Sequence, residues 1–171
     1  KIIKDHTAGE SDGILFADPK EAWYFEIGTA HYWVAQRIPD DCYAVAANEL
    51  AIQEIDFNDS DNFITAPGLQ KFVEEHNLWP NNKPFNWRRI FGTHNLLDLT
   101  YNTARVWTGQ RILSPSIKQE PSSFDIPFIQ KADHPISITD AQRVLRDHYD
   151  GTKYDVANPV NKDTAVYRPI S

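Results

Sequence analysis

The sequence predicts an α+β fold in which an antiparallel strand meander occupies the N-terminal third and is followed by helices and a long ordered loop. Short runs rich in Ile, Phe, Trp and Tyr alternate with turn residues as far as Leu50. Apolar residues then recur at helical spacing behind Pro67, and prolines punctuate residues 112–137. A chain of 171 residues is long enough for one core of ordinary size, so we expect a single domain over residues 1–171.

The first two strands are expected to form a hairpin. The runs DGILFAD and EAWYFEI flank a turn in which Pro19 presets the backbone φ of a type I turn. AHYWVAQRI and CYAVAANEL follow, so the simplest arrangement is a meander of four antiparallel strands. Alternation predicts one buried face on each of the second and third strands, made of Trp23, Phe25 and Ile27 and of Tyr32, Val34 and Ile38, with Glu26 and Arg37 on the opposite faces.

Four helices are predicted after the strands. PGLQKFVEEHN and FNWRRIFG each contain a short helix, the second ended by Gly92, and residues 95–112 form a longer one. ITDAQRVLRDHY is the last helix, with Thr139 and Gln142 at capping-box spacing. Its other expected features are Val144 and Leu145 facing the core and Gly151 at the position after the helix end.

Charge and hydropathy exclude several classes of partner. The net charge of -7 and a sequence pI near 5.3 argue against a surface that binds nucleic acid or anionic lipid. No apolar stretch approaches the roughly 20 residues of a membrane helix, and the start KIIKDHTAGESDG lacks the apolar segment of a signal peptide. We therefore expect a soluble, cytoplasmic protein. The chain opens on Lys1 and contains no Met, so we expect it to be part of something longer.

Metal, cofactor and sugar sites are not favoured by the sequence. DFNDSDNF is similar to a calcium loop, but Asp61 stands where Gly is needed and Pro67 where a bidentate Glu is needed. The six histidines are scattered, with no pair at zinc-ligand spacing. The five tryptophans could line a groove for sugar or peptide, yet most lie on periodic apolar faces typical of a core. We expect neither a metal nor a cofactor.

CYAVAANEL contains two residues that invite a catalytic interpretation. Cys42 follows two aspartates, which would raise the pKa of its thiol, so a buried spectator is favoured over a nucleophile. Asn48 stands where the apolar run ends, and its amide offers two donors that could face an oxyanion. From the residues alone, an Asn that satisfies backbone groups at a strand end remains the favoured interpretation.

The run GILFADPKEAWYFEIGTAHYWVAQRIPDDCYAVAANEL resembles the central strands of the dipeptidase A family, cysteine peptidases of the N-terminal-nucleophile hydrolase superfamily. The resemblance continues through YNTARVWTGQR, ISITDAQRVLRDHYDGTKYD and the closing YRPIS. More distantly, the chain is similar to penicillin V acylases and bile salt hydrolases. The resemblance implies an α-β-β-α sandwich and hydrolysis of dipeptides by an N-terminal cysteine, whose own α-amino group serves as the base.

The resemblance also assigns site residues. Asn48 of AANEL matches the Asn that contributes to the oxyanion site, and Arg105 of TARVW falls where the acylase branch carries an active-site Arg. Family members begin with the nucleophilic Cys, whereas this chain has no Cys before Cys42 and lacks the assisting Arg and Asp of the first strands. We therefore expect an internal segment that is inactive alone and carries an open sheet edge through which it forms homo-oligomers or aggregates.

Two alternatives to a dipeptidase stay open. One is an amidase of the penicillin V acylase and bile salt hydrolase type, because the scaffold does not determine the acyl group. The other is a non-catalytic module that binds peptide or sugar on its aromatic face.

Overall fold

The computed structural model describes residues 13–155, apart from 81, 94, 95, 97, 121, 122 and 153. A four-stranded antiparallel sheet has the order β1-β2-β3-β6, made of Gly13–Ala17, Ala22–Ile27, Trp33–Ile38 and Phe63–Thr65. Two short ladders pair β4 (Cys42–Ala44) with β8 (Ile129–Lys131), and β5 (Glu54–Ile55) with β7 (Phe85–Asn86). The helices are α2 (Leu69–Glu75), α3 (Trp87–Phe91), α4 (Asp98–Tyr101), α5 (Thr103–Leu113) and α6 (Ile138–Arg146).

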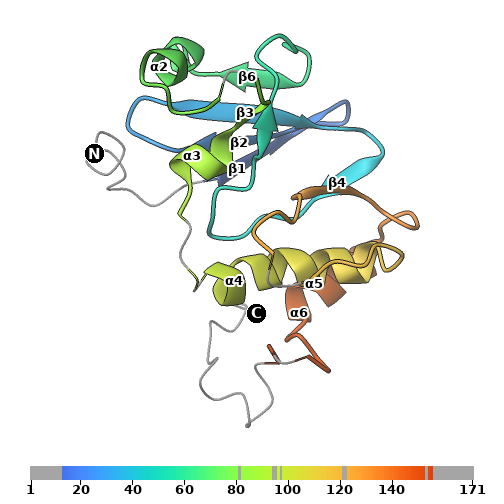
Figure 1. Cartoon of the computed structure of the whole chain (residues 1–171). Coiled ribbons are helices and arrows are strands. Elements are labelled where there is room, and N and C mark those ends of the chain that lie inside the picture. Colours follow the sequence, from blue (N-terminus) through green and yellow to red (C-terminus); the bar gives the residue numbers. More distant parts are fainter. Residues whose placement is uncertain are drawn as a thin grey trace.

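Figure 1 shows how these elements are arranged. The four-stranded sheet crosses the upper part of the view below α2, and α4, α5 and α6 lie in the lower part. The β4–β8 ladder lies between these two regions. None of the helices in the described part of the chain is long and apolar enough to cross a membrane.

The predicted hairpin is confirmed. Strands β1 and β2 pair in antiparallel register from Gly13 opposite Glu26 to Ala17 opposite Ala22. The turn between them is held by Asp18, whose backbone N–H donates to the Glu21 carbonyl at 3.0 Å. The Asp18 carboxylate also accepts the backbone N–H groups of Lys20 and Glu21, at 2.7 and 2.9 Å. An aspartate that accepts backbone donors two and three residues ahead is a common way to stabilise such a turn.

The predicted four-strand meander is correct for three strands and wrong for the fourth. The outer edge of β3 pairs with β6, and the backbone N–H of Arg37 donates to the Asn62 carbonyl at 2.9 Å. Strand β4 instead pairs with β8, with Cys42 opposite Lys131. Sequence proximity favoured β3 and β4 as neighbours, but the later segment that forms β6 takes the β3 edge and leaves β4 to a separate ladder.

The buried face of β2 is the opposite of the predicted one. Tyr24 and Glu26 are buried, whereas Trp23 and Phe25 are half-buried and Ile27 is 39% exposed. The register explains the difference, because it places Glu26 directly opposite Val34. Val34 and Ile38 of β3 are buried, as predicted, so Glu26 lies on the same buried face. This face packs against a hydrophobic core that includes Leu50, Ile52, Leu69, Trp87 and Phe91. A buried glutamate is tolerated there because backbone N–H groups satisfy it.

Each predicted helical segment contains helix, but the structure has five helices where the sequence predicted four, and two corrections follow. The single helix predicted over residues 95–112 is two helices, α4 and α5, with Asn102 between them; residues 95 and 97 lie outside the described part. Asn102 is the residue before α5 begins, and its side-chain amide donates to Asp98 at 2.8 Å. The predicted ordered loop is confirmed by Ile126 and Phe128, which are buried.

The second correction concerns α6. Its capping box is formed by Ser137 and Asp140, not by Thr139 and Gln142, because the helix begins at Ile138 and Ser137 is its N-cap. Leu145, predicted to face the core, is 69% exposed. Val144 is half-buried, and the Cβ position of Gly109 in α5 would lie 3.4 Å from it. The helix ends at Arg146, so Gly151, with a φ of 72°, belongs to the following turn.

Candidate active site

Asn48 lies in the loop between β4 and β5, and not at a strand end as the sequence predicted. β4 ends at Ala44, and one further backbone hydrogen bond joins the Val45 N–H to the Phe128 carbonyl at 2.8 Å. The chain then turns, with the Glu49 N–H donating to the Ala47 carbonyl at 2.8 Å. This turn leaves the Asn48 side chain exposed while Glu49 and Leu50 point into the protein.

The structure brings Asn48 and Arg105 together, although 57 positions separate them in the chain. Arg105 lies in the first turn of α5, and its Nη1 donates to Oδ1 of Asn48 at 2.9 Å. The two residues that the sequence singled out therefore form one contact.

The Arg105 guanidinium is held by two further acceptors. Its Nε donates to the Tyr101 carbonyl at 2.7 Å, and its Nη2 donates to Oδ1 of Asn102 at 2.5 Å. All three acceptors are neutral, and within the described ranges Arg105 forms no ion pair. Arg105 is thus fixed in place while its positive charge is not neutralised by a carboxylate in direct contact, so it can interact with an anionic group in the site.

This contact determines how the Asn48 amide is oriented. A guanidinium has only donors, so it selects the amide oxygen, and the Nδ2 group must face away from Arg105. No side chain or backbone group in the described part of the protein accepts a hydrogen bond from Nδ2. Because Asn48 is exposed, both Nδ2 donors are available to a bound molecule. Fixed amide donors of this kind can stabilise an oxyanion.

Three buried charged residues, Glu26, Glu49 and Arg88, lie in or contact the segment that begins with Glu49 and follows Asn48. Oε2 of Glu49 accepts a hydrogen bond from Nη2 of Arg88 at 2.8 Å, and both side chains are more than nine-tenths buried. Burial raises the pKa of Glu49 to about 7, against the opposing attraction of Arg88. Glu26 is also buried, and burial raises its pKa to about 7, although Ala51 and Ile52 donate backbone hydrogen bonds to it. The sequence did not predict these buried charges, since Glu26 was placed on the face of its strand opposite the predicted apolar face.

The family model of peptidase family C69 matches the chain over residues 1–171. The chain belongs to peptidase family C69. It is 50% identical over 171 residues to a probable dipeptidase of Latilactobacillus sakei and 37% identical over 173 residues to dipeptidase A of Lactobacillus helveticus. Both matches cover 99% of this chain and 36% of the relative. The chain therefore spans little more than a third of the length of these relatives, and the resemblance to the dipeptidase A family is confirmed.

In this member of peptidase family C69, Cys42 lies in the β4–β8 ladder, opposite Lys131. Its Sγ donates to Oδ1 of Asp41 at 3.5 Å. Burial raises the pKa of the Cys42 thiol, and the hydrogen bond and negative charge of Asp41 raise it further. A nucleophilic thiol needs the opposite shift, so the surroundings of Cys42 favour the spectator role that its sequence neighbours predicted.

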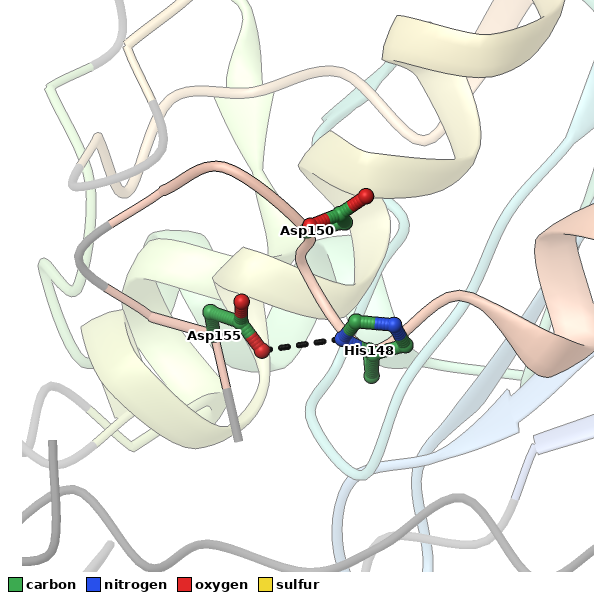
Figure 2. A group of neighbouring side chains, drawn as sticks. All are labelled: His148, Asp150 and Asp155. Carbon is green, nitrogen blue, oxygen red and sulfur yellow. Dashed lines mark hydrogen bonds and ion pairs between the residues drawn. The ribbon is translucent and has the colours of Figure 1, made fainter. Parts of the chain in front are cut away.

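A histidine and two aspartates gather in the turn that follows α6, within the motif DHYDGTKYD of the C69 chain. One ligand atom from each of His148, Asp150 and Asp155 lies within 4.8 Å of the others, and Figure 2 shows the three side chains. Nδ1 of His148 is 2.9 Å from Oδ1 of Asp155, and this contact raises the pKa of the imidazole. His148 and Asp155 thus form an ion pair when the imidazole is protonated. This group contains a single histidine, so the spacing of histidine pairs in the sequence did not indicate it.

The same turn packs beside Arg105. Tyr149 is buried and forms a small apolar cluster with Ala104 and Tyr154, next to the first turn of α5. Burial raises the pKa of Tyr149, and the nearby Arg105 charge opposes that increase. The turn after α6 therefore supports the helix end that carries Arg105.

Proposed function

We propose that the protein to which this chain belongs hydrolyses dipeptides, and that Asn48 and Arg105 stabilise the oxyanion formed during the reaction. The observation that carries the proposal is the 2.9 Å hydrogen bond from Nη1 of Arg105 to the side-chain Oδ1 of Asn48, which directs the Nδ2 donors of Asn48 away from Arg105. The names of the relatives, which are dipeptidases, support dipeptides as the substrate class.

The resemblance to N-terminal-nucleophile hydrolases supplies the rest of the mechanism. An N-terminal cysteine thiolate attacks the peptide carbonyl carbon, and the carbonyl oxygen becomes negatively charged. Nδ2 of Asn48 donates to this oxygen, and Arg105 holds the amide in place and adds a positive charge to the site. Collapse of the intermediate breaks the peptide C–N bond, and the amine of the second residue leaves with the proton that the α-amino base took from the thiol. Water then hydrolyses the acyl-enzyme and frees the thiol.

The α-β-β-α sandwich implied by the resemblance is also proposed here, and one face of the sheet supports it. The register places Ile14, Phe16, Phe25, Trp33 and Ile64 on the side opposite Tyr24 and Glu26. Phe16 is 55% exposed, and its ring meets Phe25, which in turn meets Trp33 at 5.3 Å between centroids. An apolar sheet face of this kind is what a second sheet covers in a sandwich. The cytoplasmic location and homo-oligomeric state expected from the sequence remain predictions.

Asn48→Ala in the full-length protein tests the proposed function. Removing one oxyanion donor typically lowers kcat by about two to three orders of magnitude, equivalent to about 3 to 4 kcal/mol. The unfolding midpoint should stay close to that of the wild type, because Asn48 is exposed. Cys42→Ala is the control and should leave kcat for a dipeptide unchanged.

Asn48→Ala protein with normal kcat for every dipeptide in a panel would refute the assignment. The panel should include acylated amino acids, because faster hydrolysis of these by the wild-type protein would favour the acylase alternative. Binding of peptides without turnover by the full-length protein would favour a binding module.

A further inference from the structure

The segment that follows Asn48 is held from two sides. From the sheet, the Glu26 carboxylate of β2 accepts the backbone N–H groups of Ala51 at 2.5 Å and Ile52 at 3.1 Å. From α3, backbone N–H groups donate to the Ile52 carbonyl at 3.2 Å and to the Gln53 carbonyl at 2.8 Å. The backbone of residues 51–53 is therefore fixed by both the sheet and the helix.

Glu49 extends this support to the residue next to Asn48. Asn48 is exposed and Glu49 is buried, so the two side chains point to opposite sides of the loop. One Glu49 oxygen receives the 2.8 Å hydrogen bond from Arg88 of α3, and the other, Oε1, is buried without a hydrogen-bond partner among the described residues. Because Glu49 directly follows Asn48 in the chain, a substitution that loosens the Glu49 side chain also loosens the backbone at Asn48.

Glu49 also lies near α5, the helix that carries Arg105. The groups that act on its pKa, besides burial, are Arg88 of α3, Asp98 of α4, and Thr103 and Arg105 of α5. The Thr103 hydroxyl lies close enough to lower the pKa of Glu49, although its geometry does not amount to a hydrogen bond. Glu49 thus lies where the Asn48 loop, α3 and the start of α5 meet.

We propose that Glu49, held by Arg88, is a positioning residue that keeps the Asn48 amide aligned with Arg105. The inference rests on the proposed oxyanion role of Asn48. A buried guanidinium–carboxylate hydrogen bond is strongly directional, so it defines the path of the backbone at Glu49. A small displacement of a group that contacts the reacting atoms can lower kcat strongly. The support that Glu49 gives to the Asn48 backbone therefore affects kcat.

Glu49→Gln in the full-length protein is the first test. Gln has nearly the same shape, but it lacks the charge that strengthens the bond to Arg88. We expect kcat for a dipeptide to fall about 10- to 100-fold, with KM within about 2-fold of the wild type. Glu54→Gln is the matched control, because Glu54 is exposed on β5 and should leave both constants unchanged.

The decisive measurement repeats the substitution in an Asn48→Ala background. If Glu49 acts through Asn48, Glu49→Gln should not lower kcat further there, because the group it positions has already been removed. An equal fold-loss of kcat in both backgrounds would overturn the positioning role. A normal kcat of Glu49→Gln, measured where Asn48→Ala alone lowers kcat, would also overturn the positioning role. Normal kcat of Asn48→Ala alone would instead refute the proposed function.

Arg88→Lys provides the same comparison if Glu49→Gln does not fold. Lys keeps the positive charge opposite Glu49 but lacks the planar, fixed donors of Arg. Its kcat should also fall in the wild-type background and stay unchanged in the Asn48→Ala background. Full kcat of folded Arg88→Lys protein, or a loss that persists without Asn48, would overturn the proposal.

Discussion

Arg88→Met would leave Glu49 buried without its counter-charge. The two side chains are 7% and 4% exposed and are joined by a 2.8 Å hydrogen bond. Removing one partner of a buried ion pair typically lowers the free energy of unfolding by about 3 to 5 kcal/mol, because the other charge remains uncompensated. We expect a loss of this size for Arg88→Met at pH 8.

The loss should depend on pH. Burial already raises the pKa of Glu49 from 4.5 to about 7, and loss of Arg88 would raise this pKa further. A carboxyl with a raised folded-state pKa destabilises the protein only where the unfolded chain would ionise, which begins above its ordinary pKa. At pH 5 the Glu49 of the folded variant is protonated and neutral. The loss at pH 5 should therefore be much smaller than the loss at pH 8.

Urea unfolding followed by tryptophan fluorescence measures both losses in the full-length protein. Arg89→Met is the matched control, since Arg89 is the next residue of α3 and its ion pair with Asp125 joins side chains that are 52% and 68% exposed. An exposed pair contributes at most about 1 kcal/mol. The double variant Arg88→Met with Glu49→Leu should recover most of the loss at pH 8. Equal losses at pH 5 and pH 8, or equal losses for Arg88→Met and Arg89→Met, would refute the reasoning.

Two further predictions concern a buried carboxyl and a helix cap. Burial raises the pKa of Glu26 from 4.5 to about 7, so the free energy of unfolding should decrease as pH rises from 4.5 to about 7. In urea unfolding, the free energy of unfolding of Glu26→Gln should depend less on pH over this range than that of the wild type. The same pH dependence in both proteins would contradict the prediction. Ser137→Ala removes the N-cap of α6 and should lower the free energy of unfolding by about 1 kcal/mol. Thr139→Ala should lower the free energy of unfolding by less than Ser137→Ala does. A larger loss for Thr139→Ala would instead support the Thr139–Gln142 capping box that the sequence predicted.

Local signals predicted many of the elements. Pro19 and Asp18 place the β1–β2 turn, and Gly92 ends α3 where the sequence indicated. These features depend on backbone preferences and on contacts within a few residues. The face of β2 was predicted wrongly because apolar residues occupy both sides of this strand. Alternation cannot rank Trp23 and Phe25 against Tyr24 as core residues, and it placed Glu26 on the face opposite the predicted apolar one, which is the face that is buried.

Only part of the candidate site could be predicted from the sequence. Asn48 and Arg105 came from the resemblance to a family, and their contact across 57 positions required the fold. Glu49 was visible in the NEL tripeptide, but nothing local linked it to Arg88, which lies 39 positions later. A charged residue directly inside an apolar run is a signal that could have drawn attention to it, since such residues are rarely buried unless paired.

By itself, the sequence determined the family, the hairpin and the positions of the short helices, because these depend on residue identity and on interactions between near neighbours. Tertiary structure alone decided which face of β2 is buried, that β6 and not β4 pairs with β3, and that Arg105 reaches Asn48. The physical reason is that these outcomes depend on competition between segments distant in the chain. A sheet edge accepts the strand that also buries its apolar side, and a buried carboxylate is tolerated only where distant donors converge on it.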